Sequence, residues 1–153
     1  MKQLLLICAA VMGQSVLGAD KKPLIADPIV EKAIRKSLKK TTGELTKADL
    51  EKVTGLVLFN KQLTDVPKEL EKLTQLSSLY LHVNKLTSVK GLEKLTQLRL
   101  LNLYNNKLTD VKGLEKLNQL TWLDLRGNPD LTKAKIAELQ KALPNCKITY
   151  DFK

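Results

Sequence analysis

The chain has very little of the chemistry that metal sites, disulfides and nucleotide sites require. Its 153 residues include one histidine and two cysteines. His82 and Cys146 cannot together supply the four ligands of a typical zinc site. The other cysteine, Cys8, falls in a segment that we expect to be removed, so Cys146 has no partner for an internal disulfide. Since a glycine-rich phosphate loop is also missing, the sequence predicts no metal and no cofactor.

A hydrolytic active site is equally poorly supported. Ser78 and His82 lie four positions apart on one expected strand, which separates their backbones by roughly 13 Å. A general base must lie within about 3 Å of the nucleophile whose proton it takes. We therefore predict that the chain is not an enzyme.

Long apolar runs are scarce. The stretch from Leu4 to Val11 is shorter than the roughly 20 residues that a membrane-spanning helix needs, and no second run follows it. Lys2 ahead of this stretch and Gly18 and Ala19 behind it are typical of a secretory signal peptide. The sequence predicts a signal peptide over residues 1–19 and a secreted or periplasmic protein with no transmembrane segment.

Arginine is rare although the chain is strongly basic. The formal net charge of +10 comes from 26 basic residues, of which only Arg35, Arg99 and Arg126 are arginines. Surfaces that bind nucleic acid usually interleave basic residues with aromatic rings, and the lysines here are not arranged in that way. We interpret them as a solvated surface and predict no nucleic-acid partner. The alternative interpretation is a cationic, envelope-associated protein that binds acidic glycan or lipid surfaces.

The main positive feature is a 22-residue repeat rich in leucine. Three copies share one spacing: Leu76-x-x-Leu79-x-Leu81-x-x-Asn84-x-Leu86, Leu98-x-x-Leu101-x-Leu103-x-x-Asn106-x-Leu108 and Leu120-x-x-Leu123-x-Leu125-x-x-Asn128. A looser copy begins at Val53, and a degenerate last copy reads Leu143-x-x-Cys146-x-Ile148. This is the leucine-rich-repeat signature, in which each unit buries its leucines against the next unit. The predicted fold class is an α/β solenoid, a short horseshoe with about five parallel strands.

Helix signals flank the repeats on both sides. Asp27-Pro28 is a typical helix start, and Thr46 with Asp49 forms a capping-box pattern. Thr132 precedes an apolar helical pattern that Pro144 ends, and a last strand follows. These signals predict a helical N-terminal cap and a helix-plus-strand C-terminal cap. The expected boundaries are residues 20–52 for the linker and N-terminal cap, 53–130 for the repeats and 131–153 for the C-terminal cap.

Two kinds of residue have defined places in this repeat. The repeated asparagines should form a buried ladder that satisfies backbone groups where each strand ends, with Lys61 in place of the first one. Cys146 aligns with Leu123 in the last copy and is therefore predicted to be buried as a small apolar side chain.

The outward strand positions collect most of the aromatic residues. Side chains alternate along a strand, so the residues between the leucines point to the concave surface. Four of the six aromatic residues of the chain fall there, with its only histidine. Large amphipathic side chains on a rigid surface are typical of binding hot spots, although strands favour aromatic residues in any case. The candidate protein-binding residues are Phe59, Tyr80, His82, Tyr104, Trp122, Asp124 and Arg126.

The segment that starts at Leu108, Leu-Thr-Asp-Val-Lys-Gly-Leu-Glu-Lys-Leu-Asn-Gln-Leu, resembles the 22-residue internalin-like class of bacterial leucine-rich repeats. The lead-in Leu-Thr-Lys-Ala-Asp-Leu from Leu45 is similar to the caps of those proteins, and the resemblance covers about residues 27–150. It implies a scaffold whose concave sheet binds a protein ligand. We therefore predict an exported, non-enzymatic module that binds a protein or peptide on its concave face.

Overall fold

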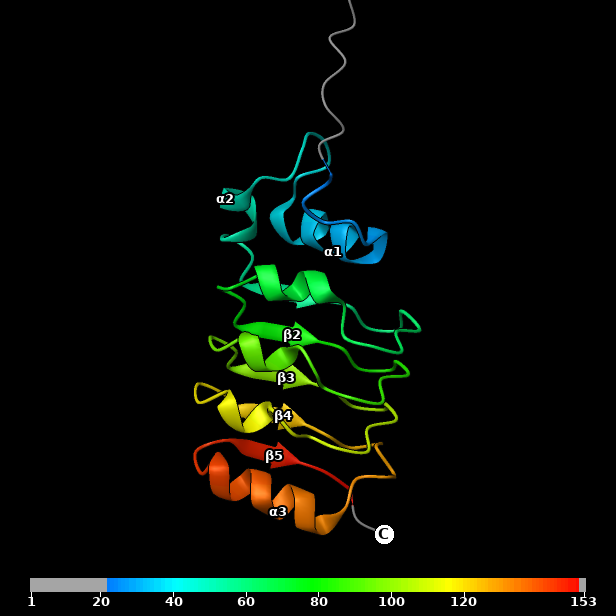
Figure 1. Cartoon of the computed structure of the whole chain (residues 1–153), viewed down its shortest axis with the longest axis vertical. Helices are drawn as coiled ribbons and strands as arrows, with labels where there is room; N and C mark the ends of the chain where they lie inside the picture. The colour runs from blue at the N-terminus through cyan, green and yellow to red at the C-terminus, as the bar shows by residue number, and fades with distance from the viewer. Residues whose placement is uncertain (1–21, 152–153) are drawn as a thin grey trace, which may run out of the picture.

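The computed structural model describes residues 22–151, which form a stack of short parallel strands with helices at both ends (Figure 1). The strands are β1 (Gly55–Val57), β2 (Ser78–Tyr80), β3 (Leu100–Asn102), β4 (Trp122–Asp124) and β5 (Lys147–Thr149). They form one sheet in sequence order, and every neighbouring pair is parallel. The predicted short leucine-rich-repeat solenoid is confirmed. The expected signal peptide over residues 1–19 lies outside the described residues.

The core is a column of leucines contributed by successive units. Leu56, Leu79, Leu101 and Leu123 lie at the centres of β1 to β4, are paired in register and are at most 1% exposed. Full burial of one such side chain contributes about 1.5–3 kcal/mol, so the stacked column is the main source of stability. On the other side of the core, the chain returns from each of the first three strands through a short 3₁₀ helix. These are η1 (Lys68–Lys72), η2 (Leu92–Lys94) and η3 (Leu114–Lys116).

The predicted asparagine ladder is present where the strands end. The Asn106 Nδ2 donates to the carbonyl oxygens of Leu81 and Leu103, and its Oδ1 accepts from the backbone N–H of Leu86. Asn128 and Asn84 repeat this pattern one unit later and one unit earlier. Each buried amide thus joins two successive units and pairs backbone groups that have left the sheet.

The residue just before each ladder position has a left-handed backbone. Asn60, Val83, Asn105 and Gly127 occupy equivalent places, with φ values of 53°, 56°, 54° and 69°. Glycine is required at the last of these because a Cβ on Gly127 would lie 3.0 Å from the backbone of Asn105. Asparagine tolerates this conformation, but β-branched valine rarely adopts it. Val83 is therefore a strained position inside an otherwise regular repeat.

Two helices cover the N-terminal end of the core, as Figure 1 shows. α1 (Pro28–Leu38) is capped by Asp27, whose carboxylate accepts from the backbone N–H groups of Ile29 and Val30. α2 (Lys47–Leu50) has the predicted capping box between Thr46 and Asp49. No helix within residues 22–151 is long and apolar enough to cross a membrane.

The C-terminal end is closed by α3 (Lys133–Ala142) and β5, but the expected alignment of the last unit was wrong. Leu123 pairs with Ile148 and not with Cys146. Cys146 instead takes the place that Leu120 has in the preceding unit. The backbone N–H of Cys146 donates to the carbonyl of Leu143, just as the backbone N–H of Leu120 donates to the carbonyl of Leu117. The reason is that α3 is much longer than the 3₁₀ segments that it replaces. Cys146 is still buried, at 4% exposure, as predicted.

Candidate protein-binding face

The outward residues of the strands form rows across the sheet. Because the strands are in register, Tyr80 lies beside Asn102, and Asp124 comes next in the same row. Phe59, His82, Tyr104 and Arg126 each follow two positions later in their units. Hydrogen bonds from Asn60 to His82, from Val83 to Tyr104 and from Asn105 to Arg126 keep this second row in register beyond the strands. The structure divides the candidate residues of the two rows into two clusters.

The first, the aromatic cluster, consists of Phe59, Tyr80 and His82. The ring of Phe59 is stacked on the imidazole of His82, with centroids 4.9 Å apart and planes inclined by 16°. Tyr80 meets the same imidazole edge to face, at 6.2 Å and 78°. Phe59 is 46% exposed, whereas its two neighbours are half-buried. The contacts hold the three rings in one arrangement while leaving the Phe59 ring open to a partner.

The second, the arginine cluster, consists of Tyr104, Asp124 and Arg126. The guanidinium of Arg126 donates to both carboxylate oxygens of Asp124, at 2.9 Å from Nε to Oδ1 and 2.6 Å from Nη2 to Oδ2. Its Cζ lies 5.7 Å from the centroid of the Tyr104 ring, which is a cation–π distance. Tyr104 is 41% exposed and Arg126 is exposed. This cluster offers a partner one ring and one oriented cation.

Asp124 lies in the outward row, as its place in the repeat predicts, but its side chain is buried. The residue is only 2% exposed, so its carboxylate is not presented to a partner. Burial raises the pKa of Asp124, but the hydrogen bonds and the charge of Arg126 outweigh burial and hold the pKa below its ordinary value. The buried carboxylate of Asp124 therefore holds the guanidinium of Arg126 in one orientation.

Trp122 lies apart from both clusters. It begins β4 and is in register with Leu100 on one side and Lys147 on the other, in a row that neither cluster shares. The side chain is half-buried on the same face of the sheet. Trp122 is thus an outward residue, as predicted, and it belongs to neither cluster.

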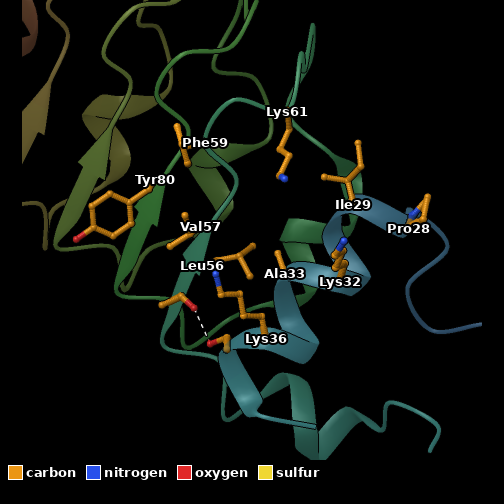
Figure 2. A pocket seen from close by; sticks show the side chains of 12 residues that line it. Pro28, Ile29, Lys32, Ala33, Lys36, Leu56, Val57, Phe59, Lys61 and Tyr80 are labelled. Carbon is orange, nitrogen blue, oxygen red and sulfur yellow. Dashed lines mark hydrogen bonds between the residues drawn. The ribbon is translucent and has the colours of Figure 1, made fainter. Parts of the chain in front are cut away.

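Sequence reasoning missed a hollow between α1 and β1 at the N-terminal end of this face (Figure 2). Its volume is about 830 Å³, within the range of small-ligand and peptide sites. Val57, which forms part of its floor, is 53% exposed and is the most exposed large apolar residue among residues 22–151. The available signal was the pair Ile29 and Ala33, one helical turn apart, which line the hollow from α1.

The described residues offer no metal centre. Within residues 22–151 there is no group of three histidine, cysteine, aspartate or glutamate side chains that could hold a metal ion. The only histidine side chain of the chain, His82, is engaged with Phe59 and Tyr80.

Comparison with solved structures identifies the class of protein. The chain is similar to internalin C2 of Listeria monocytogenes, with a TM-score of 0.71 and 25% identity over 85% of this chain and 56% of that one. It is also similar to the functional domain of InlJ from the same organism, with a TM-score of 0.66 and 26% identity over 82% of this chain and 26% of that one. A leucine-rich-repeat protein of Leptospira interrogans matches with a TM-score of 0.50 and 29% identity, over 71% of this chain and 34% of that one.

These likenesses, together with the five-stranded parallel sheet, define a leucine-rich-repeat solenoid. More particularly, the chain is a bacterial internalin-like leucine-rich-repeat protein. No protein-family model and no curated protein sequence matches it. The chain spans about half the length of the internalin C2 structure and about a quarter of that of InlJ. The likeness supports a protein-interaction module in general terms.

Proposed function

We propose that the chain is an exported, non-enzymatic module that binds a protein or peptide on the concave face of its sheet. The observation that carries the proposal is the arginine cluster. An exposed tyrosine ring and a guanidinium held by a buried carboxylate lie together on a surface that the leucine core makes rigid. Tyrosine, tryptophan and arginine are the residues most enriched at binding hot spots.

Preorganisation is the physical advantage of this arrangement. A long arginine side chain normally loses rotamer freedom when it is immobilised in an interface, and this loss weakens binding by about 0.5–1.5 kcal/mol. The two hydrogen bonds that the Arg126 guanidinium donates to Asp124 fix it over Tyr104 before a partner arrives. The aromatic cluster supplies a second fixed group of rings on the same face.

The experiment compares variants of the concave face with variants of the opposite side. The immobilised chain would be used to capture a ligand from the envelope fraction of the producing cell, and its affinity would then be measured by surface plasmon resonance. Tyr104→Ala and Trp122→Ala should each weaken binding by about 2 kcal/mol if the residue is a hot spot. The matched control is Lys94→Gln with Lys116→Gln, since both lysines lie on the 3₁₀ helices of the convex side.

The cationic-surface alternative makes the opposite prediction. If the lysine pair abolished binding and the aromatic changes did not, the concave-face proposal would be wrong. Raising the salt concentration also distinguishes the concave-face proposal from the cationic-surface alternative. The affinity for an acidic surface collapses as ionic strength rises, whereas the affinity of aromatic recognition falls much less.

Export is part of the proposal and rests on the sequence of residues 1–19. Mass spectrometry of protein recovered outside the cytoplasm should find Ala19 or Asp20 as its first residue. Recovery of exported protein that still begins at Met1 would contradict the proposed signal peptide.

A further inference from the structure

The hollow between α1 and β1, hereafter the N-terminal groove, has an apolar floor and walls. Ile29 and Ala33 of α1 form one wall, and Val57 and Phe59 form the floor beside Tyr80 (Figure 2). Val57 and Phe59 are 53% and 46% exposed, so the two most exposed large apolar residues among residues 22–151 lie in this one place. Exposed apolar surface that gathers in a concave site is typical of binding sites.

Three lysines surround this floor. Lys32 and Lys36 extend from α1 and Lys61 from the turn after β1, and none of the residues that line the groove is acidic. Within residues 22–151, the ammonium groups of these lysines take part in no ion pair. Other lysines of the same region are paired, as Lys40 is with Asp49 at 2.7 Å. The groove therefore combines apolar surface with uncompensated positive charge, and its complement is an apolar group flanked by carboxylates.

The backbone of β1 favours a peptide over a lipid as the source of those groups. The backbone groups of Thr54 and Leu58 hydrogen-bond to the neighbouring unit that contains β2. Because successive residues of a strand direct their backbone groups to opposite sides, the N–H and C=O groups of Gly55 and Val57 point to the free edge of the sheet. The carbonyl of Gly55 accepts from the Ser37 hydroxyl at 2.8 Å, which ties α1 to this edge. The backbone groups of Val57 lie beside the groove, where an extended peptide can pair with them.

We propose that the N-terminal groove binds a short acidic peptide segment, with an apolar side chain on Val57 and Phe59 and flanking carboxylates on Lys32, Lys36 and Lys61. This inference rests on the proposed function, because it names the chemistry of the ligand and the part of the concave face that binds it. It assigns to α1 a binding role in addition to capping the core.

The test begins with selection of a phage-displayed library of random linear peptides on the full chain. The enriched peptides should share an apolar residue between aspartates or glutamates. Their affinities would be measured by fluorescence anisotropy, with peptides in which glutamine and asparagine replace the acidic residues as a comparison. The neutral peptides should bind about tenfold more weakly or worse.

Variants of the groove locate the site. The triple change Lys32→Glu, Lys36→Glu, Lys61→Glu should weaken binding by about tenfold or more, since it reverses the charge facing the peptide. The matched control is Lys90→Glu, Lys107→Glu, Lys112→Glu, which changes the net charge equally at exposed positions outside the groove. That control should change the affinity by less than about threefold at physiological salt.

A single change at the floor tests the apolar contact. Val57→Asp should weaken binding strongly. Val57→Ile keeps an apolar side chain at this position and should therefore retain binding. Because Val57 is more than half exposed, neither change should alter thermal unfolding enough to affect the measurement.

Four outcomes would overturn the inference. The first is a library that yields no binder or only peptides without acidic residues. The second is binding that is lost equally in the groove and control triple variants. The third is competition by phosphatidylglycerol vesicles, which would assign the groove to a lipid surface. Peptides that lose affinity with Tyr104→Ala but not with the groove variants would also overturn it while leaving the proposed function intact.

Discussion

The carboxylate of Asp124 holds the guanidinium of Arg126 through two hydrogen bonds, although the two residues differ completely in exposure. Asp124 is 2% exposed, whereas the side chain of Arg126 is 50% exposed. The pair is therefore anchored at its acidic end in the sheet and presents its basic end to solvent. This relationship makes the orientation of Arg126 depend on the charge state of a buried group.

The first prediction concerns this pair. Asp124→Asn should lower the free energy of unfolding by about 1–2 kcal/mol at neutral pH, because it removes charge-assisted hydrogen bonds. The pKa of Asp124 is lowered in the folded chain from an ordinary value of 3.8, so its stabilising effect is complete above that pH and is lost as the pH falls through the folded pKa. Urea unfolding measured from pH 7 to pH 2 should show the two proteins converging in acid. A difference in unfolding free energy between the two proteins that stays constant over this pH range would contradict the stabilising role of the ionised Asp124 carboxylate.

The second prediction concerns the asparagine ladder. Asn106→Ala removes a buried amide that pairs three backbone groups, and it should cost roughly 1–3 kcal/mol of unfolding free energy. Lys61→Ala is the matched control, because Lys61 occupies the equivalent position in the first unit and is exposed. The control should stay within about 0.5 kcal/mol of the parent in chemical denaturation. Equal shifts for both variants would show that the ladder contributes little.

The third prediction concerns Cys146, measured in a Cys8→Ser background so that one thiol is present. Burial raises the pKa of Cys146 to about 11 and leaves the residue 4% exposed. A disulfide reagent at pH 8 should therefore react slowly with the native chain and rapidly in denaturant, because the thiolate is the reactive form. The raised pKa also means that this group stabilises the fold below pH 9 and that the contribution is lost as the pH approaches 11. Immediate labelling of the native protein would contradict the burial.

The fourth prediction concerns the strained backbone at Val83. The equivalent positions hold asparagine or glycine, and a left-handed conformation costs an ordinary residue about 1–2 kcal/mol. Val83→Asn should therefore raise the stability by up to about 1 kcal/mol, as seen in the midpoint of thermal unfolding. Val57→Asn is the control, since that valine does not have a positive φ. A similar gain in the control would show that the backbone is not the cause.

The repeat region could be predicted from the sequence because its determinants are local and recur. Leu79 and Leu101 have the same neighbours one unit apart, so one pattern specifies the burial and the register of both. The ladder asparagines follow from the same period. The last unit could not be aligned, because a pattern with one cysteine and one isoleucine does not reveal that α3 adds residues before β5.

The site was less predictable because it depends on how neighbouring elements pack. The outward positions of Phe59, Tyr104 and Arg126 follow from strand alternation. The burial of Asp124, by contrast, depends on the side chain of Arg126, which hydrogen-bonds to its carboxylate. The N-terminal groove depends on the packing of α1 against β1, which no period in the sequence specifies. Ile29 and Ala33 are half-buried and pack against the core, and both also line the groove.

The ladder also makes each repeat unit an interchangeable cassette. The amide of Asn106 bonds to Leu81 and Leu86 of the unit before it, and the amide of Asn128 bonds in the same way to Leu103 and Leu108. An inserted copy would present the same partners to both neighbours and leave the two caps unchanged. Duplication or loss of one cassette would therefore alter the area of the concave face in discrete steps without a new core having to evolve.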